Sequence, residues 1–311
     1  MEKLNFILVT GGAGNIGSAL AKALSDKNYK VVVVDNLLTG KRSKIVESED
    51  LIFIKGDVNE RIFVEELFNQ FEFDYVFHYA AMVGVQRTLS NPLKVLNDIE
   101  GIKNILHYSL ETGVKRVFYA SSSEVYGEPF EIPQKENTTP LNSKLPYAIV
   151  KNVGESFFKS YQKEHGLNYT IFRFFNTYGV NQSEDFVIPR FIKAALKDQP
   201  IRIYGDGSQT RTFCNVEDNV EVTLRTLEDP NYENQLLNVG SDDEISILEL
   251  AKKIIKISKS GSRIEFLPPL AEGDMARRCP DISKMKGILN RDLISLDHGI
   301  KSLINHYEGR D

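Results

Sequence analysis

A tyrosine and a lysine four positions apart, Tyr147 and Lys151, are the residues of this 311-residue chain best spaced for chemistry. A helix places positions i and i+4 on one face, so the phenol and the ammonium can converge on one point. An unperturbed tyrosine is a poor base at neutral pH, but a neighbouring positive charge favours the phenolate and lowers its pKa. We therefore predict that Tyr147 accepts an alcohol proton and that Lys151 tunes it.

A glycine-spaced turn near the start of the chain indicates a dinucleotide site. Gly11, Gly14 and Gly17 follow an apolar run and open a predicted helix, where the backbone can approach a pyrophosphate whose charge the helix N-terminus favours. Asp35 ends the next apolar run, where a carboxylate accepts the ribose hydroxyls of NAD and repels the 2'-phosphate of NADP. NAD is thus the predicted cofactor, and the reaction is hydride transfer. The expected contacts are Gly11, Gly14, Asn15, Ile16, Gly17, Asp35, Asn36, Asp57, Val58, Ala80, Tyr147 and Lys151.

Short apolar runs alternate with segments of helical spacing, which is typical of an α/β doubly wound parallel (Rossmann) sheet covered on both faces. The predicted strands are Phe6–Val9, Val31–Val34, Leu51–Ile54, Tyr75–Phe77, Val117–Ala120, Tyr169–Phe174 and Leu236–Val239. The predicted helices include Ser18–Lys27, Arg61–Gln70, Val95–Thr112 and Tyr147–His165. The alternation loosens after residue 175, so we expect a Rossmann domain of residues 1–175 plus 212–239. A smaller discontinuous α/β lobe would take residues 176–211 plus 240–311.

Composition excludes several classes of protein. The chain is 41% hydrophobic and 26% charged, as in ordinary globular proteins, and its net charge of -5 comes without a basic block. The sequence therefore does not predict a basic patch that would bind nucleic acid. No apolar run approaches the roughly 18 residues of a membrane span. The two cysteines, Cys214 and Cys279, are isolated, so no disulfide or metal site is predicted. We expect a cytoplasmic protein.

Several motifs occur in the order typical of extended short-chain dehydrogenases/reductases that act on nucleotide-diphosphate sugars, and the chain resembles that family over nearly its whole length. The motifs are residues 10–17, Gly56-Asp57-Val58, residues 78–81, 121–127 and 147–151, Arg173-Phe174-Phe175-Asn176 and residues 205–211. The resemblance implies oxidation of the sugar C4 hydroxyl, which Ser122 orients for Tyr147. It also implies a nucleotide-diphosphate sugar in the smaller lobe and a homodimer packed through Val95–Thr112 and Tyr147–His165.

Glu124 completes the predicted catalytic set of Tyr147, Lys151, Ser122 and Glu124. In the family, 4,6-dehydratases and UDP-glucuronate decarboxylases resemble this chain in having a glutamate there, whereas simple 4-epimerases usually have a small or neutral residue. A carboxylate beside a C4 ketone can remove the acidic C5 proton. The resemblance also implies a substrate-binding set. Its members are Arg87, Ser123, Asn176, Arg211 and Arg278.

The product stays open at this point, because the motifs are mixed. Ser123 differs from the aspartate of dTDP-glucose dehydratases, and the loop at residues 82–87 lacks the proline-rich sequence of the decarboxylases. The resemblance leaves a 4-dehydrogenase, a 4-epimerase or a 4,6-dehydratase, including enzymes that handle GDP-heptose or related surface-polysaccharide precursors. The alternatives are a UDP-glucuronate decarboxylase-like enzyme and a non-catalytic NAD-binding sensor. Nothing in the sequence identifies the nucleotide base.

Overall fold

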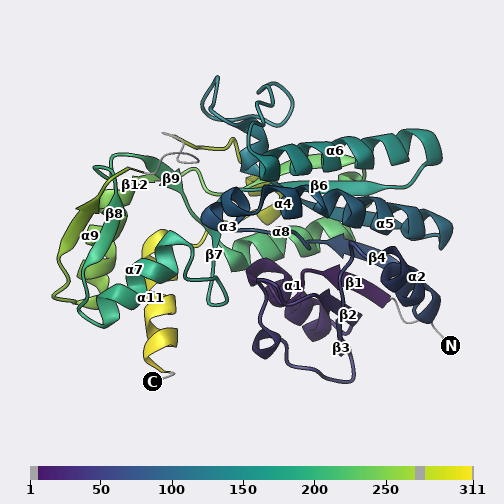
Figure 1. Cartoon of the computed structure of the whole chain (residues 1–311), viewed down its shortest axis with the longest axis horizontal. Helices are drawn as coiled ribbons and strands as arrows, with labels where there is room; N and C mark the ends of the chain where they lie inside the picture. The colour runs from purple at the N-terminus through teal and green to yellow at the C-terminus, as the bar shows by residue number, and fades with distance from the viewer. Residues whose placement is uncertain (1–5, 270–276, 310–311) are drawn as a thin grey trace.

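The structure is a computed structural model that describes residues 6–269 and 277–309. Its centre is a seven-stranded sheet with the strand order β11-β6-β5-β4-β1-β2-β3 (Figure 1). Every pairing in this sheet is parallel. The strands are β1 (Phe6–Thr10), β2 (Lys30–Asp35), β3 (Leu51–Lys55), β4 (Phe73–His78), β5 (Arg116–Ser122), β6 (Tyr169–Phe174) and β11 (Gln235–Val239). The predicted Rossmann-type fold is confirmed, and each predicted strand belongs to this sheet.

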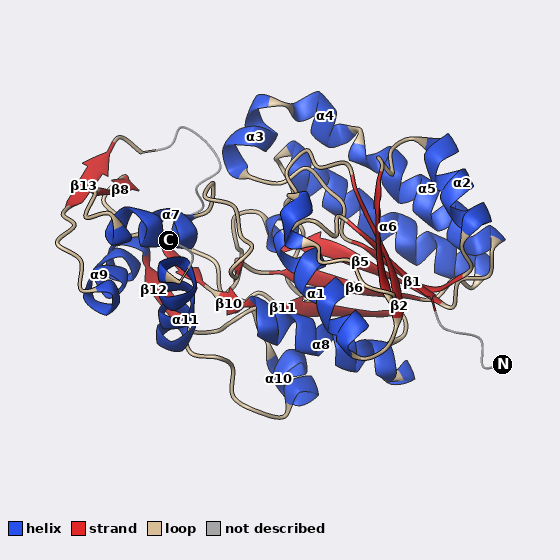
Figure 2. Ribbon diagram, turned by 90° about the horizontal axis from the view of Figure 1, so that it is seen from below, coloured by secondary structure: helices blue, strands red, loops and turns tan. Residues whose placement is uncertain are grey.

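Helices cover both faces of the sheet, as Figure 2 shows. One face carries α1 (Asn15–Asp26), α8 (Val216–Glu228) and α10 (Ser283–Leu289), and the other carries α2 (Arg61–Gln70), α5 (Asp98–Glu111) and α6 (Pro146–His165). The strand β2 explains the apolar runs: Val31 and Val33 join one hydrophobic cluster, whereas Val32 and Val34 join the other. Successive side chains of a strand point to opposite faces, so a strand covered twice must be apolar throughout.

The predicted helix Val95–Thr112 is two helices in the structure. A short helix α4 (Pro92–Leu96) follows α3 (Val85–Ser90), and α5 begins at Asp98 after a break at Asn97. The first turn of α5 is anchored from outside, because the backbone N–H of Gly101 donates to Asn59 Oδ1 over 3.0 Å. This contact ties the first turn of α5 to the segment that follows β3.

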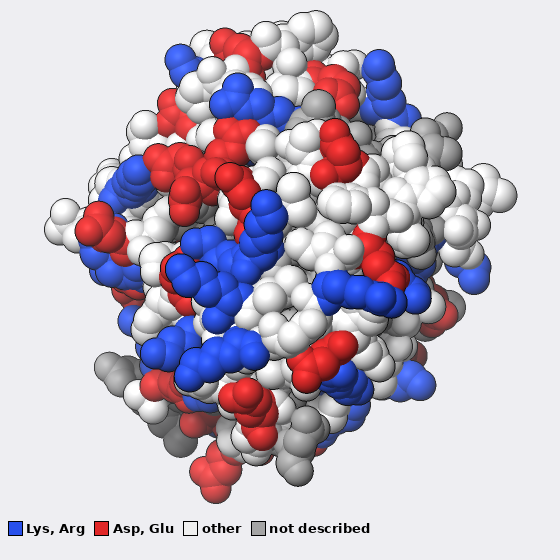
Figure 3. Space-filling view, turned by 90° about the vertical axis from the view of Figure 1, so that its left-hand side faces the viewer, with Lys and Arg blue, Asp and Glu red and all other residues white. Residues whose placement is uncertain are grey.

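A smaller lobe lies at one end of the molecule, at the left in Figure 1. Helices α7 (Val187–Leu196), α9 (Ile247–Ser258) and α11 (Leu296–Glu308) enclose a separate apolar cluster with the parallel pair β8 (Ile201–Tyr204) and β13 (Ile264–Leu267). Acidic and basic side chains are interspersed on its outer face (Figure 3). The smaller elements are β7 (Thr177–Tyr178), β9 (Thr210–Thr212), β10 (Cys214–Asn215), β12 (Glu244–Ser246), η1 (Arg42–Lys44), η2 (Ser123–Tyr126) and η3 (Pro230–Tyr232).

Helix α10 lies in the stretch expected for the smaller lobe, but it packs with α8 and β11 on the sheet. The exact division into two domains stays a proposal. Within residues 6–269 and 277–309, no helix combines the length and the apolar character that a membrane span requires.

A buried ion pair connects α6 to the sheet. Arg173 on β6 donates from Nε to Glu155 Oε1 (2.8 Å) and from Nη2 to Glu155 Oε2 (2.6 Å), and the Ser121 hydroxyl donates to Oε1 (2.6 Å). All three side chains are buried. A two-point contact of this kind compensates the desolvation of both charges and sets the position of α6 against β5 and β6.

We predict that Glu155→Ala lowers the free energy of unfolding by about 3–5 kcal/mol, because it leaves the buried guanidinium of Arg173 without its counter-charge. Urea denaturation measures the effect. Lys22→Ala is the control, since it breaks the exposed pair between Lys22 and Asp26 and should change stability little. Equal losses in the two variants would show that the buried pair does not anchor α6.

Candidate active site

A cavity of about 690 Å³ opens where the strands of the sheet end. The carboxyl ends of parallel strands share one edge of a sheet, which is where α/β proteins bind their ligands. The predicted site residues in its lining are Gly11, Gly14, Asn15, Ile16, Gly17, Asp35, Asn36, Asp57, Val58, Ala80, Arg87, Ser122, Ser123, Glu124, Tyr147, Lys151, Asn176 and Arg278. Arg211, on β9, is buried and outside this lining, and its Nη1 donates to the Thr210 carbonyl (2.7 Å).

The glycine turn forms one wall of the cavity and fits a dinucleotide. Gly11 has φ +66°, and a Cβ there would lie 2.6 Å from the backbone N of Ala80. A Cβ on Gly17 would lie 2.5 Å from the Gly11 carbonyl oxygen. Only glycine lets β1, α1 and the end of β4 approach so closely. Asn15 Oδ1, at the start of α1, is a buried oxygen without a hydrogen-bond partner in the described structure.

Two carboxylates are held beside that wall. The buried Asp35 accepts from the backbone N–H groups of Ala13 (3.0 Å) and Leu37 (2.8 Å), which fix its orientation at the end of β2. Asp57, after β3, accepts from the Asn36 side chain (3.0 Å). The N-terminus of α1 suits a pyrophosphate, and the carboxylates beside it can accept hydrogen bonds from ribose hydroxyls. The residues present therefore fit NAD.

Three of the four predicted catalytic side chains, Ser122, Tyr147 and Lys151, come from β5 and α6. Ser122 is the last residue of β5, and a hydrogen bond with the Ser122 side chain lowers the pKa of Tyr147, although burial raises it more strongly. Lys151, one turn along α6, donates from Nζ to the Ala120 carbonyl (2.6 Å) and lies 5.7 Å from the centre of the Tyr147 ring. Pro146 at the start of α6 has a φ suited to the first helical turn, which brings Tyr147 to the cavity.

Burial is the largest cause of the pKa shifts around Tyr147. It lowers the pKa of Lys151 to about 8, against the opposing effect of Asp98. It also lowers the pKa of His78 to about 3, so this imidazole is neutral, and its Nδ1 lies 3.0 Å from the Thr10 hydroxyl oxygen. Asp98 was not predicted as a site residue. It lines the cavity and accepts from the Met82 backbone N–H (2.8 Å).

An ion pair forms another part of the cavity wall. Arg278 Nη1 lies 2.7 Å from Glu124 Oε1, and the two side chains are 6% and 18% exposed. Glu124 belongs to η2, whereas Arg278 precedes α10. Both charges reach the phenol of Tyr147: Glu124 raises its pKa and Arg278 lowers it. Both residues are candidates from the sequence analysis, and the structure brings them together near Tyr147.

Two other substrate candidates have local partners. Arg87 donates to the Val83 carbonyl (2.9 Å) and pairs with Asp185 (2.8 Å) at the rim of the cavity. Asn176 adopts the left-handed conformation, with φ +34°, and its side chain donates to the Thr212 carbonyl (2.9 Å). Asparagine tolerates this conformation better than most residues, so Asn176 also shapes the chain after β6.

Comparisons with known proteins agree with this geometry. The model of the NAD dependent epimerase/dehydratase family matches residues 7–240. The chain is 36% identical to the UDP-N-acetyl-alpha-D-glucosaminuronate decarboxylase of Bacillus cytotoxicus over 96% of its own length and 97% of that protein.

This chain belongs to the NAD-dependent epimerase/dehydratase family.

Solved structures of family members match it closely. The UDP-glucose 4-epimerase of Thermotoga maritima, solved with UDP-glucose, has a TM-score of 0.92 at 30% identity and covers 98% of this chain and 99% of its own. The UDP-glucuronic acid 4-epimerase of Bacillus cereus, solved with UDP-glucuronic acid and NAD, has a TM-score of 0.89 at 29% identity over 98% and 100% of the two chains.

Membership of the epimerase/dehydratase family confirms the resemblance seen in the sequence. It also confirms an NAD-dependent enzyme of nucleotide-sugar metabolism, so the sensor hypothesis is set aside. Bound NAD supplies the hydride acceptor. Gly11, Gly14 and Gly17 would hold its pyrophosphate, and Asp35 its adenosine ribose.

The burial of Lys151 should make the folding stability of the protein depend on pH. The pKa of Lys151 falls from 10.5 to about 8 on folding, so the folded chain carries a penalty below pH 8 that is relieved as the pH rises toward 10.5. We expect the stability of the cofactor-free wild type, relative to Lys151→Met, to rise with pH across that window by up to about 3 kcal/mol. Urea denaturation between pH 7 and 10 measures it. Lys163→Met, at an exposed position of α6, controls for the loss of a positive charge. If the difference in unfolding free energy between the wild type and Lys151→Met stayed constant over this pH range, the prediction would be wrong.

Proposed function

We propose that this enzyme decarboxylates a UDP-hexuronate, starting by oxidising the sugar C4 hydroxyl. The observation that carries the proposal is the Glu124–Arg278 pair in the cavity wall. Burying two charges costs free energy that a site for a neutral hexose would have no need to spend. A guanidinium beside the C4 base suits a sugar whose C6 is a carboxylate. The name of the Bacillus cytotoxicus relative supports this choice of substrate class.

The first step uses the residues at the end of β5 and the start of α6. Tyr147 removes the C4 hydroxyl proton while C4 loses its hydride, and Ser122 orients the same hydroxyl. Burial raises the pKa of Tyr147 in the free chain. Nearby positive charges must therefore lower this pKa before Tyr147 can act as a base. Lys151 contributes part of that charge from 5.7 Å. This step yields a 4-keto sugar.

The second step follows from the chemistry of that ketone. A 4-keto hexuronate is a β-keto acid, so the C5–C6 bond can break with its electron pair moving to the C4 carbonyl as an enolate. Carbon dioxide leaves, and C5 takes a proton from water. Arg278 would hold the carboxylate before this step, and Glu124 would orient the guanidinium. The hydride then returns to C4, Tyr147 gives back the proton, and the product is a UDP-pentose.

A 4-epimerase acting on the same uronate is the second candidate. Its support is the Bacillus cereus neighbour, whose name describes this reaction on UDP-glucuronic acid. Arg278 would then bind the carboxylate without its loss. The 4,6-dehydratase and GDP-heptose hypotheses stay predictions that a substrate panel separates by product mass.

We predict that the wild-type protein releases carbon dioxide from UDP-glucuronate or its N-acetylated relative, with no net change in NAD. Tyr147→Phe should slow the reaction by about 10²–10⁴-fold, since it removes the general base. Arg278→Met should weaken uronate binding by at least about tenfold, because it removes the carboxylate's partner. Product masses and released carbon dioxide give the readout, with UDP-, GDP-, dTDP- and CDP-sugars compared.

Tyr161→Phe is the matched control for the base variant, because Tyr161 lies further along α6 and outside the cavity lining. It should retain wild-type turnover. A product of unchanged mass would replace decarboxylation by epimerisation, and a loss of water would indicate a dehydratase. Unchanged turnover in Tyr147→Phe would refute the assigned base.

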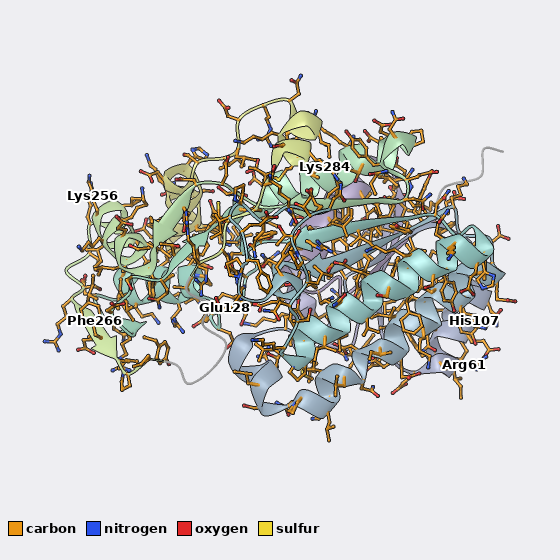
Figure 4. The ribbon with its side chains drawn as sticks, turned by 90° about the horizontal axis from the view of Figure 1, so that it is seen from above. Arg61, His107, Glu128, Lys256, Phe266 and Lys284 are labelled. Atoms are coloured by element: carbon orange, nitrogen blue, oxygen red, sulfur yellow. The ribbon has the colours of Figure 1, made fainter. Side chains whose placement is uncertain are left out.

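We also propose a homodimer packed through α5 and α6, as the resemblance implies. Exposed apolar side chains on α4 and α6 support it: Leu96 on α4 and Ile149 on α6 are exposed, and Leu93 on α4, which also lines the cavity, is 81% exposed. Light scattering should give the mass of a dimer, and Leu93→Glu with Ile149→Glu should give a monomer. Phe266→Glu is the control, because Phe266 is exposed on β13 at the far end of the lobe (Figure 4). A monomeric wild type would contradict the proposal.

A further inference from the structure

Asn238 lies near the end of β11 with no exposed surface, and its amide joins three segments of the chain. Its Nδ2 donates to the carbonyl oxygens of Gln134 (2.9 Å) and Asp281 (3.3 Å). Its Oδ1 accepts from the Tyr126 hydroxyl (2.8 Å). Its backbone N–H donates to Glu136 Oε1 (3.0 Å). Tyr126, Gln134, Asn238 and Asp281 are called the Asn238 clamp below.

The clamp reaches both partners of the cavity ion pair through very short stretches of chain. Tyr126 follows Glu124 by two residues within η2, and Asp281 follows Arg278 by three residues. Glu124 and Arg278 themselves are 154 positions apart in the sequence. One buried side chain therefore ties together the two segments that present the carboxylate and the guanidinium to the cavity.

A second set of contacts locks the segment that carries Arg278. Gln134 forms a parallel bridge with Pro280, in which the Gln134 N–H donates to the Cys279 carbonyl (2.8 Å) and the Asp281 N–H donates to the Gln134 carbonyl (2.8 Å). Gln134 belongs to the stretch between η2 and α6, whose start near Glu128 lies between the sheet and the smaller lobe (Figure 4). The segments around Gln134 and Arg278 lie outside the seven-stranded sheet. Because few backbone hydrogen bonds hold segments of this kind, each such bond contributes to their position.

We propose that Asn238 is a positioning residue for the second chemical step, holding Glu124 and Arg278 at the spacing that step requires. It acts through its neighbours, because none of the four clamp residues lines the cavity. The inference rests on the proposed decarboxylation. An interior amide with its polar atoms paired is rigid, and small displacements of a catalytic group reduce rate steeply.

The clamp makes a prediction that a general loss of stability would not reproduce. The residues of the first step, Tyr147, Lys151 and Ser122, sit on α6 and β5. Among the described residues, their side chains bond to one another, to the Ala120 carbonyl and to the Glu124 N–H, not to a clamp residue. Glu124 and Arg278 shift the pKa of Tyr147 in opposite directions, so displacing both should change C4 oxidation little. Loosening the clamp should therefore slow loss of carbon dioxide much more than C4 oxidation. The 4-keto sugar and NADH should accumulate in proportion.

The experiment compares Tyr126→Phe and Asn238→Asp with the wild-type protein in single turnovers on UDP-glucuronate. Tyr126→Phe removes the hydroxyl that bonds to Asn238 and to Arg173 and should slow carbon dioxide release by about tenfold. Asn238→Asp removes two donors and leaves the Arg173 contact in place, and it should slow the release by about a hundredfold. NADH should form at rates within about twofold of the wild type, the scatter expected for an unaffected step. Thr226→Ala is the stability control, because it deletes a buried hydroxyl bond within α8, away from the cavity.

Hydrogen exchange gives a readout independent of turnover. The amides of Gln134 and Asp281 should exchange at least about tenfold faster in Asn238→Asp than in the wild type or Thr226→Ala, since the bridge they form has lost its anchor. Equal slowing of both chemical steps, or unchanged exchange at these amides, would overturn the clamp. If the wild type releases no carbon dioxide, the proposed function fails, and the exchange result alone decides whether Asn238 holds the Arg278 segment.

Discussion

The bond from Lys151 Nζ to the Ala120 carbonyl, at 2.6 Å, is the contact on which the site depends. It ties the first turns of α6 to the end of β5, so the ammonium, the Tyr147 phenol and the Ser122 hydroxyl occupy one corner of the cavity. The ion pair of Glu155 with Arg173 holds the same helix further along. The two anchors give α6 a fixed position relative to the sheet, and a base must be placed this firmly to act.

Burial sets the direction of the pKa shifts of Lys151 and Tyr147, and nearby charges change their size. Desolvation lowers the pKa of Lys151 and raises that of Tyr147, so both groups disfavour charge in the free chain. Asp98 partly restores the ammonium, and Arg278 favours the phenolate. The Glu124–Arg278 pair thus shifts the pKa of Tyr147 in two opposing directions, and in the proposed reaction its guanidinium also binds the carboxylate of the sugar.

Local sequence patterns predicted the parts of this molecule that depend on local physics. Strands buried on both faces read as apolar runs, and the Tyr147–Lys151 spacing and the glycine turn each lie within one short segment. Contacts between distant segments had no such local pattern. The pairing of Glu124 with Arg278 joins positions 154 apart in the sequence, and Asp98 has the pattern of an ordinary acidic residue in a first helical turn. Arg211 matched a motif, and its Nη1 donates to the Thr210 carbonyl outside the cavity lining, so its role in substrate binding stays a prediction.

In the proposed reaction a hydride leaves the sugar C4 and returns to it after the carboxylate is lost. The decisive experiment incubates UDP-glucuronate carrying deuterium at C4 with the wild-type protein in ordinary water and follows the product by NMR. We predict a UDP-pentose that retains deuterium at C4. Exchange of that deuterium with solvent would contradict hydride transfer at C4, and recovery of an intact hexuronate would contradict loss of the carboxylate.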